Sequence, residues 1–260
     1  MKEEIKVVTN TKVDLSNSML IVAFPTVGLV SLIAGRFVID TLDLEEIGSI
    51  ESPYNAPATV IHKGVPMAPI RIYAGKKRCG PNGACSQLAI ILSEFMPSWE
   101  LINPMAETIL NWARQNKCKY IVTIEGTNAV GEKVASNPKV FGLGNNQSMR
   151  DLLKKYKIEE NEEGLITGVT GVILYKSIQL DLNVLCLLSE VHVSYPDSRS
   201  AGRLLEKLNL LIPEMKINPE PLYKEAETIE HMINKVMQQA TATSEHMQKK
   251  GMDAIPRMYA

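Results

Sequence analysis

Residues 19–28 read MLIVAFPTVG, a run of six apolar residues followed by a turn. A run that is apolar at every position is typical of a central strand whose two faces are both buried in an α/β sheet. The turn Pro25-Thr26-Val27-Gly28 follows, and we predict a helix over residues 27–39. Small residues, among them Ala34 and Gly35, allow that helix to lie close to the sheet.

Two other interpretations of this segment are disfavoured. Residues 15–35 carry no charge and are about long enough to span a bilayer, but Pro25 and Thr26 divide them into a β-branched half and a helical half. A phosphate loop has the right strand, turn and helix context, yet neither the Gly-x-Gly-x-x-Gly nor the Walker pattern is present. Close packing of helix on strand therefore explains the glycine of the turn.

Further strands and helices follow along the chain and predict an α/β fold with an antiparallel middle part. We expect an edge strand at 4–8 and further strands at 47–51, 59–62, 67–74, 87–94, 120–124 and 184–188. We expect helices at 103–115, 148–155 and 173–180, and one that ends near residue 211 and is capped by Asp197 or Ser198.

Composition excludes several classes of function. The 260 residues are 45% hydrophobic and 22% charged, with a formal net charge of -1. A near-neutral chain with 5% aromatic residues presents neither a basic surface for nucleic acid or an anionic membrane nor a surface for stacking bases. The first residues lack a signal-peptide pattern, so we expect a cytoplasmic protein with no membrane partner.

The cysteines give no metal-site pattern, because none of the four forms a Cys-x-x-Cys pair. Cys79 and Cys85 flank a glycine-rich loop and could form a disulfide across a hairpin, but free thiols are the expected state in the cytosol. We predict no metal and no cofactor.

Two places were candidates for small-molecule chemistry. Loops after strands of an α/β sheet often hold ligands, which draws attention to Thr127 and to Asn145 at the end of a glycine-rich segment, residues 142–146. A plain surface crossover is the favoured interpretation. Ser194, His192 and Asp197 have the side chains of a catalytic triad, but they lie close in sequence and no nucleophile elbow is present. We predict no catalytic residue.

A long helix is predicted over residues 218–251, capped by Asn218. Apolar residues recur in it at alternating spacings of four and three, the pattern of a coiled-coil seam or of a helix lying in a groove. The seam consists of Leu222, Ala226, Ile229, Ile233, Val236 and Ala240. It could pack on the body of the same chain or pair with the helix of another subunit, and we expect a mixture of the two.

The last residues, Met258-Tyr259-Ala260, combine an apolar side chain, an aromatic ring and a terminal carboxylate. They resemble the hydrophobic-Tyr-X motif with which proteasome-activating ATPases and some assembly chaperones dock between α-subunits of the proteasome. By that resemblance, the carboxylate of Ala260 meets a lysine of the pocket and Tyr259 packs at its rim, with Met258 as the hydrophobic member. Most chain termini have no partner, so the body of the chain has to support this interpretation.

The body resembles the archaeal proteasome-assembly chaperone family, and with the terminal motif its PbaB type. The resemblance covers residues 1–211 and rests on residues 19–30, 164–174 and 195–201. It implies a three-layer α/β/α sandwich like that of nucleoside phosphorylases, and a homo-oligomer, a tetramer. The expected organisation is an α/β domain at 1–217, a C-terminal helix at 218–251 and a flexible docking tail at 252–260.

The leading hypothesis is therefore a non-catalytic proteasome assembly chaperone or ATP-independent activator whose partner is the proteasome α-subunit ring. One alternative is an enzyme acting on a nucleoside-like molecule near Thr127 and Asn145. Another is a purely structural oligomer held together by its final helices.

Overall fold

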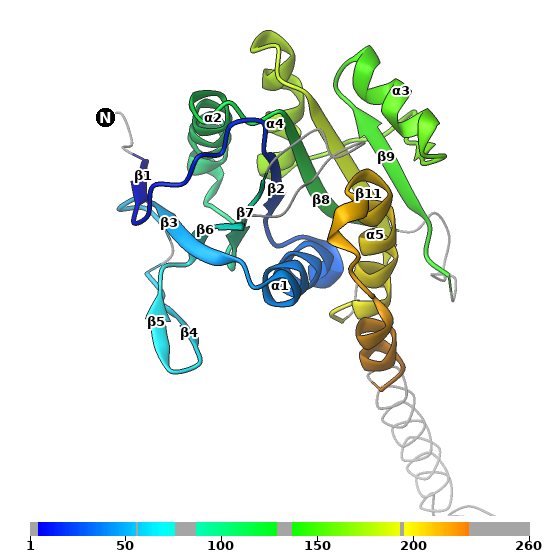
Figure 1. Ribbon diagram of the computed structural model, residues 1–260, viewed down its shortest axis with the longest axis horizontal. Helices are drawn as coiled ribbons and strands as arrows, with labels where there is room; N and C mark the ends of the chain where they lie inside the picture. Colours follow the sequence, from blue (N-terminus) through cyan, green and yellow to red (C-terminus); the bar gives the residue numbers. More distant parts are fainter. Residues whose placement is uncertain (1–4, 56, 76–86, 129–136, 193–194, 229–260) are drawn as a thin grey trace, which may run out of the picture.

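The computed structural model describes residues 5–55, 57–75, 87–128, 137–192 and 195–228. Within them, one nine-stranded mixed sheet forms the centre, and helices cover both of its faces (Figure 1). The α/β class and the three-layer α/β/α arrangement expected from the sequence are both confirmed.

The strands are short, and their order in the sheet is β1-β3-β6-β7-β2-β8-β11-β9-β10. Their bounds are β1 (Lys6–Thr9), β2 (Met19–Ala23), β3 (Glu45–Glu51), β6 (Ile70–Gly75), β7 (Leu88–Ser93), β8 (Tyr120–Asn128), β9 (Val140–Gly144), β10 (Glu159–Glu160) and β11 (Val184–Val191). Strands β4 (Val60–His62) and β5 (Val65–Met67) form a separate hairpin that projects from the body (Figure 1).

The helices connect these strands. Their bounds are η1 (Val27–Leu29), α1 (Val30–Leu42), α2 (Trp99–Gln115), α3 (Gln147–Lys155), α4 (Gly168–Gln179), α5 (Ser198–Leu211) and η3 (Pro213–Met215). A further helix begins at residue 220 and is described as far as residue 228. None of the described helices is both long and apolar enough to cross a bilayer.

The two layers of helices explain why β2 is apolar throughout. Met19, Ile21 and Ala23 pack in the core under α1 and α5, whereas Leu20 and Val22 pack in the core under α2 and α4. Alternate side chains of a strand point to opposite faces of the sheet, so a strand covered on both faces needs apolar residues at every position.

The directions of the strands divide the sheet into a parallel centre and antiparallel flanks. Strands β7, β2, β8 and β11 run parallel to one another, while β1, β3 and β6 are joined by antiparallel pairs. This arrangement confirms the antiparallel middle part that the sequence predicts. It also places the carboxyl ends of the four parallel strands on the same side of the molecule.

Several predicted boundaries are wrong. Helix α1 begins at Val30, because Gly28 and Leu29 have left-handed backbone angles (φ 67° and 52°). Helix α2 begins at Trp99, one turn before the expected start, and contains Pro104. The predicted strand at 67–74 is divided, since β5 pairs with the hairpin strand β4 and β6 with the central sheet.

Two other differences concern glycine. Helix α4 begins at Gly168 rather than near residue 173. The segment expected as a loop at 142–146 forms most of β9, which pairs antiparallel with β11. Its glycines serve packing: a Cβ atom on Gly142 would lie 2.4 Å from Leu153 Cδ2 of α3, and one on Gly144 would lie 2.7 Å from the Arg150 backbone nitrogen.

Candidate functional site

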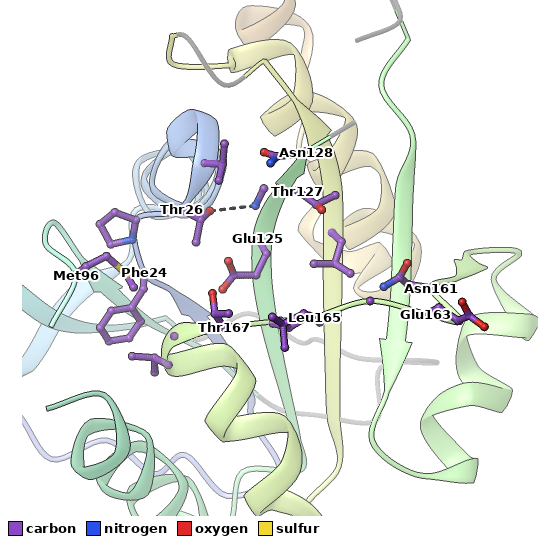
Figure 2. Close-up of a pocket in the computed structure, with 18 residues that line it drawn as sticks. Phe24, Thr26, Met96, Glu125, Thr127, Asn128, Asn161, Glu163, Leu165 and Thr167 are labelled. Atoms are coloured by element: carbon purple, nitrogen blue, oxygen red, sulfur yellow. Dashed lines mark hydrogen bonds between the residues drawn. The ribbon is translucent and has the colours of Figure 1, made fainter. Parts of the chain in front are cut away.

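A cavity of about 470 Å³ opens at the carboxyl ends of the parallel strands β2, β8 and β11 (Figure 2). Its polar wall comes from the turn after β2, from the end of β8 and from the loop before α4. Its apolar wall comes from the same turn, from the residues after β7 and from β11. The lining includes Phe24, Thr26, Met96, Glu125, Thr127, Asn128, Asn161, Glu163, Ile166, Thr167, Val169 and Leu188.

The position of this cavity follows from the topology. Strands β2 and β7 are neighbours, but the chain leaving β2 forms α1 on one face of the sheet, while the chain leaving β7 forms α2 on the opposite face. Segments that depart to opposite faces leave a crevice beyond the strand ends, which is where open α/β sheets bind ligands. The site therefore has the geometry of a small-molecule pocket and a volume in the usual range of roughly 300–1,000 Å³.

Thr26 ties the turn after β2 to strand β8. The β2–β8 register ends at the pair Val22 and Thr123, and beyond it the Thr26 Oγ1 atom accepts a hydrogen bond from the Gly126 backbone N–H at 3.0 Å. The Ser31 hydroxyl donates to the Phe24 carbonyl, which leaves the Thr26 hydroxyl to donate to Ser31 Oγ at 3.1 Å. The Thr26 hydroxyl thus donates one hydrogen bond and accepts another in holding the wall together.

Gly126 is required at this junction. A Cβ atom on Gly126 would lie 2.1 Å from the Val27 carbonyl oxygen and 3.0 Å from Val191 Cγ1. Since the first of these atoms belongs to the backbone, no side-chain rotation could relieve the clash. The turn after β2 can approach β8 only because residue 126 has no side chain.

Glu125 is the buried acid of the cavity. Its side chain comes from β8, is 9% exposed and accepts a hydrogen bond from the Thr170 hydroxyl of α4. Burial raises the pKa of Glu125 to about 8, and the Thr170 hydrogen bond lowers it only partly. A carboxyl group with this pKa keeps its proton at neutral pH and can act as either donor or acceptor. Figure 2 shows it directed into the space near Thr26 and Thr167.

The N-terminus of α4 forms another part of the wall. Thr167 is the N-cap residue but makes no side-chain capping bond, and Gly168 has a left-handed backbone (φ 72°). Gly171 is needed one turn later, because a Cβ atom there would lie 2.3 Å from the Ile166 carbonyl oxygen. The glycines near 164–171 thus let the chain fold tightly from the loop into the helix.

Of the triad-like residues, Asp197 and His192 are described, and both make structural contacts. Both carboxylate oxygens of Asp197 accept backbone N–H groups, from His192 at 2.9 Å and from Ser200 at 2.9 Å, so Asp197 is the N-cap of α5 as predicted. The His192 ring stacks on Tyr195, with 5.0 Å between ring centroids. Ser194 lies outside the described residues.

Thr127 and Asn145 lie near opposite ends of β11, so the alternative of a single ligand site near both residues is wrong. Thr127 pairs with Glu190 near the end of β11, whereas the Asn145 backbone N–H bonds to the Val184 carbonyl at its start, at 3.1 Å. These positions are six residue steps apart on β11, which corresponds to about 20 Å. Thr127 lines the cavity, while the Asn145 side chain bonds to Ser177, to the Leu182 carbonyl and to the Val184 N–H.

Sequence reasoning missed Glu125 and Thr170 as a pair. The available signal was an acidic residue directly after the buried run at 120–124, but the expected strand ended there. In the structure β8 continues to Asn128, and strand geometry therefore places Glu125 on the face under α4. Thr170 carried no signal in the sequence, because it looks like any helical threonine.

The C-terminal helix starts on α5. Leu222 and Ala226 are both 4% exposed. The Tyr223 hydroxyl donates a hydrogen bond to Glu206 at 2.6 Å. The Tyr223 ring packs against Gly202 of α5, where an added Cβ atom would lie 2.5 Å from the ring. Asn218 accepts a hydrogen bond from the Glu220 N–H at 3.1 Å, as expected of a cap.

The remaining predicted residues of the seam and tail lie outside the described residues. They are Ile229, Ile233, Val236, Ala240, Met258, Tyr259 and Ala260. The same holds for Cys79 and Cys85, whereas Cys118 and Cys186 are free thiols. No cluster of metal-ligating side chains occurs in the part of the chain that the structure describes.

The fold and the cavity together define a class of protein, the three-layer α/β/α sandwiches with a pocket at the carboxyl ends of a parallel centre. Comparison with known families is more specific, since residues 20–237 match the PAC2 family model. The chain belongs to the PAC2 family.

Individual relatives agree with this assignment. An uncharacterized protein of Methanocaldococcus jannaschii is 33% identical over 239 residues, which cover 92% of this chain and 93% of the relative.

Among solved structures, one similar protein is PbaA of Pyrococcus furiosus, an archaeal homologue of proteasome-assembly chaperone. It is 26% identical to this chain with a TM-score of 0.78, and the match covers 97% of this chain and 99% of the PbaA chain. PbaB of the same organism, an archaeal proteasome activator, is 21% identical with a TM-score of 0.77, and the match covers 91% of this chain and 100% of the PbaB chain. At this identity, the match to PbaB shows the shared fold alone.

Proposed function

We propose that this protein is a proteasome assembly chaperone, an ATP-independent proteasome activator, or both, and that it docks on the proteasome α-ring through its C-terminal tail. The observation that carries the proposal is the similarity to PbaA, a proteasome-assembly chaperone homologue, at 26% identity over 97% of this chain. The similarity to the activator PbaB adds support at the level of the fold. The lack of a Walker pattern in the sequence agrees with action without ATP.

The proposed contact uses the three residues Met258, Tyr259 and Ala260. The terminal carboxylate pairs with a cation in a pocket between α-subunits, and the Tyr259 ring packs at the rim. Capture of a terminal carboxylate by pocket donors is an established mode of peptide recognition. Nine extended residues, 252–260, reach at most about 30 Å, which is enough to enter a cleft from a body that rests on the ring.

The described start of the C-terminal helix supplies a firm base for this tail. Tyr223 and Leu222 fix the helix to α5 through a hydrogen bond and a buried apolar contact. A tail fixed at its base searches a smaller volume than a free peptide, and this raises its effective concentration at the pocket.

Self-association, as a tetramer, is part of the proposal because several tails on one body bind a ring of repeated pockets more tightly than one. Exposed apolar side chains on α2 and α4 support it: Trp99 is 82% exposed, Tyr175 51% and Ile178 62%. Trp99 and Tyr175 line one shallow groove between these helices. We propose that the assembly works in the cytoplasm and performs no catalysis.

The test combines the full chain with purified proteasome α-rings from the same organism, and complexes are measured by co-elution and by surface plasmon resonance. Removing residues 258–260, or changing Tyr259→Ala, should weaken binding at least tenfold. Tyr54→Ala is the matched control, because it removes a tyrosine that is 47% exposed in the segment between β3 and β4, outside α2, α4 and the tail, and should leave ring binding unchanged.

Each alternative result has a definite meaning. Unchanged binding after removal of the tail excludes the tail as the docking element. No complex with the full chain excludes the α-ring as the partner. Peptide hydrolysis by intact core particles then separates an activator, which raises the rate, from an assembly factor, which leaves it unchanged.

A further inference from the structure

We propose that the cavity at the ends of β2, β8 and β11 binds a small organic amine, whose ammonium group pairs with the carboxylate of Glu125. This site is separate from the proposed docking tail, and the inference does not depend on the proteasome. It concerns a ligand that the folded body would bind in either case.

The charge of the lining selects the class of ligand. Glu125 and Glu163 both contribute to the lining, and none of the described lining residues is a lysine, arginine or histidine. Among the described residues, a phosphate or carboxylate ligand would meet two acids and no basic side chain to balance it. A cation meets a favourable charge, because opposite charges within about 4–6 Å stabilise each other.

Glu125 is placed to receive that cation. One carboxyl oxygen accepts the Thr170 hydroxyl, and no described group donates to the other oxygen. The residue is 9% exposed, so its carboxylate has lost most of its contact with water. A buried acid with an uncommitted oxygen facing a cavity is costly to ionise until a cation or donor arrives.

The apolar wall selects the rest of the ligand. Phe24, Met96 and Leu188 face the same cavity, and Val169 closes it from α4. A ligand therefore needs a carbon skeleton that covers these side chains, with its amine at the Glu125 end. Glu163 is an exposed residue on the opposite side, directed away from Glu125 (Figure 2), so it lies at the rim.

Binding should release a proton. Burial raises the pKa of Glu125 to about 8, so at neutral pH the empty site holds a protonated carboxyl, and an ammonium ion binds as that proton leaves for the solvent. Among the described residues, the groups with a printed interaction at Glu125 are the Thr170 hydroxyl of α4, which donates to it, and the Cys186 thiol of β11, whose pKa its charge raises. The pKa of Cys186 is raised by burial first and by the charge of Glu125 second, so Cys186 stays neutral and does not supply the pH dependence. The N-terminus of α4 favours the ionised form of Glu125, as a bound cation does.

The test measures binding to the full chain by isothermal titration calorimetry, with phenethylamine as probe and 2-phenylethanol and inorganic phosphate as neutral and anionic comparisons. We expect the amine to bind at least tenfold more tightly than either comparison. Its affinity should rise roughly 25-fold from pH 6.5 to pH 8.5, because the ionised fraction of a carboxyl group with a pKa of about 8 increases by that factor over the interval.

Two variants and one spectroscopic measurement complete the design. Glu125→Gln keeps the shape and the Thr170 hydrogen bond but should weaken amine binding at least tenfold and remove its pH dependence. Glu107→Gln is the control, because this carboxylate pairs with Lys176 outside the cavity, and amine binding should not change. In the unsubstituted protein, the ¹³C carboxyl resonance of Glu125 should move to the ionised position when phenethylamine is added at pH 7.

The proposal is overturned if phosphate or 2-phenylethanol binds as well as the amine, or if none of the probes binds at millimolar concentration. It is also overturned if the Glu125 resonance stays in its protonated position in the saturated complex, an outcome that does not depend on how well a variant folds.

Discussion

The Thr26 Oγ1 atom accepts a hydrogen bond from the Gly126 backbone N–H at 3.0 Å, although the two residues are 100 positions apart. Strands β2 and β8 stop pairing at Val22 and Thr123, so the threonine side chain supplies the acceptor that a strand carbonyl would otherwise provide. This bond fixes the turn after β2 against β8 and thereby shapes one wall of the cavity.

Replacing Thr26 by valine should destabilise the fold. Valine keeps the shape of threonine but leaves the Gly126 N–H without its acceptor, at a cost of about 1–3 kcal/mol. Thr26→Ser keeps the hydroxyl and should cost less than the valine variant. Chemical denaturation measures both free energies of unfolding, and equal losses in the two variants would mean that the hydrogen bond contributes nothing.

Replacing Gly126 by alanine should have a larger effect. The new Cβ atom would lie 2.1 Å from the Val27 carbonyl oxygen, so backbone must move, and we expect a loss of at least about 2 kcal/mol. Thermal unfolding would show this as a melting temperature lower by roughly 5 °C or more. Gly64→Asn is the control, because Gly64 lies in open space with φ +80°, a conformation that asparagine tolerates. A stable Gly126→Ala variant would contradict the close approach of the two segments.

Asp197 should prove structural rather than catalytic. Its carboxylate holds the first turn of α5 through Ser200 and the end of β11 through His192. Asp197→Ala removes both acceptors and should cost about 2 kcal/mol. Asp197→Asn keeps one acceptor, so its free energy of unfolding, measured by urea denaturation, should lie between those of the original chain and the alanine variant. An alanine variant as stable as the original chain would exclude the capping role.

Glu125 should make the stability of the protein depend on pH. Its pKa is about 8 in the folded protein against an ordinary value of 4.5. Between these values the folded state binds more protons than the unfolded state, so the free energy of unfolding falls as pH rises, by up to about 1.4 kcal/mol per pH unit. The contribution of Glu125 to stability is complete below pH 4.5 and is lost as the pH rises through about 8.

Glu125→Gln cannot ionise and should lack this component. The measurement is the difference in free energy of unfolding between the original chain and the variant, followed from pH 5 to pH 9. Other groups titrate equally in both proteins and cancel in the difference, and Glu107→Gln serves as the exposed-residue control. A difference that does not change with pH would show that Glu125 is ionised in the folded protein at every pH tested.

Much of the fold could be predicted because its signals are local. The apolar run at 19–24 identified the central strand, and Asp197 and Asn218 identified two helix starts through their capping chemistry. Boundaries were wrong where neighbouring segments decide the conformation. Residues 142–144 became strand β9 because β11 offers a partner, and α1 starts late because Gly28 turns against Val191, whose Cβ lies 3.0 Å from the position of a Gly28 Cβ.

The candidate site was predicted less well. Thr127 was expected in the loop after a strand, but it lies within β8, where it lines the cavity. Asn145 was assigned to the same site, although it lies near the other end of β11. Strand direction decides which loops meet, and a list of strands without their pairing does not contain that information. The proposed docking residues 258–260 stay a prediction of the sequence, outside the described residues.

The sequence by itself determined that strands such as β2 would be buried on both faces, since an apolar residue at every position leaves no face for water. Only the tertiary structure decided that Glu125 lies beneath α4 with Thr170, and that the backbone of Val27 packs directly against Gly126. The physical reason is that burial, and with it the pKa of a carboxyl group, depends on which distant segments surround a residue, and no local pattern in the chain records that.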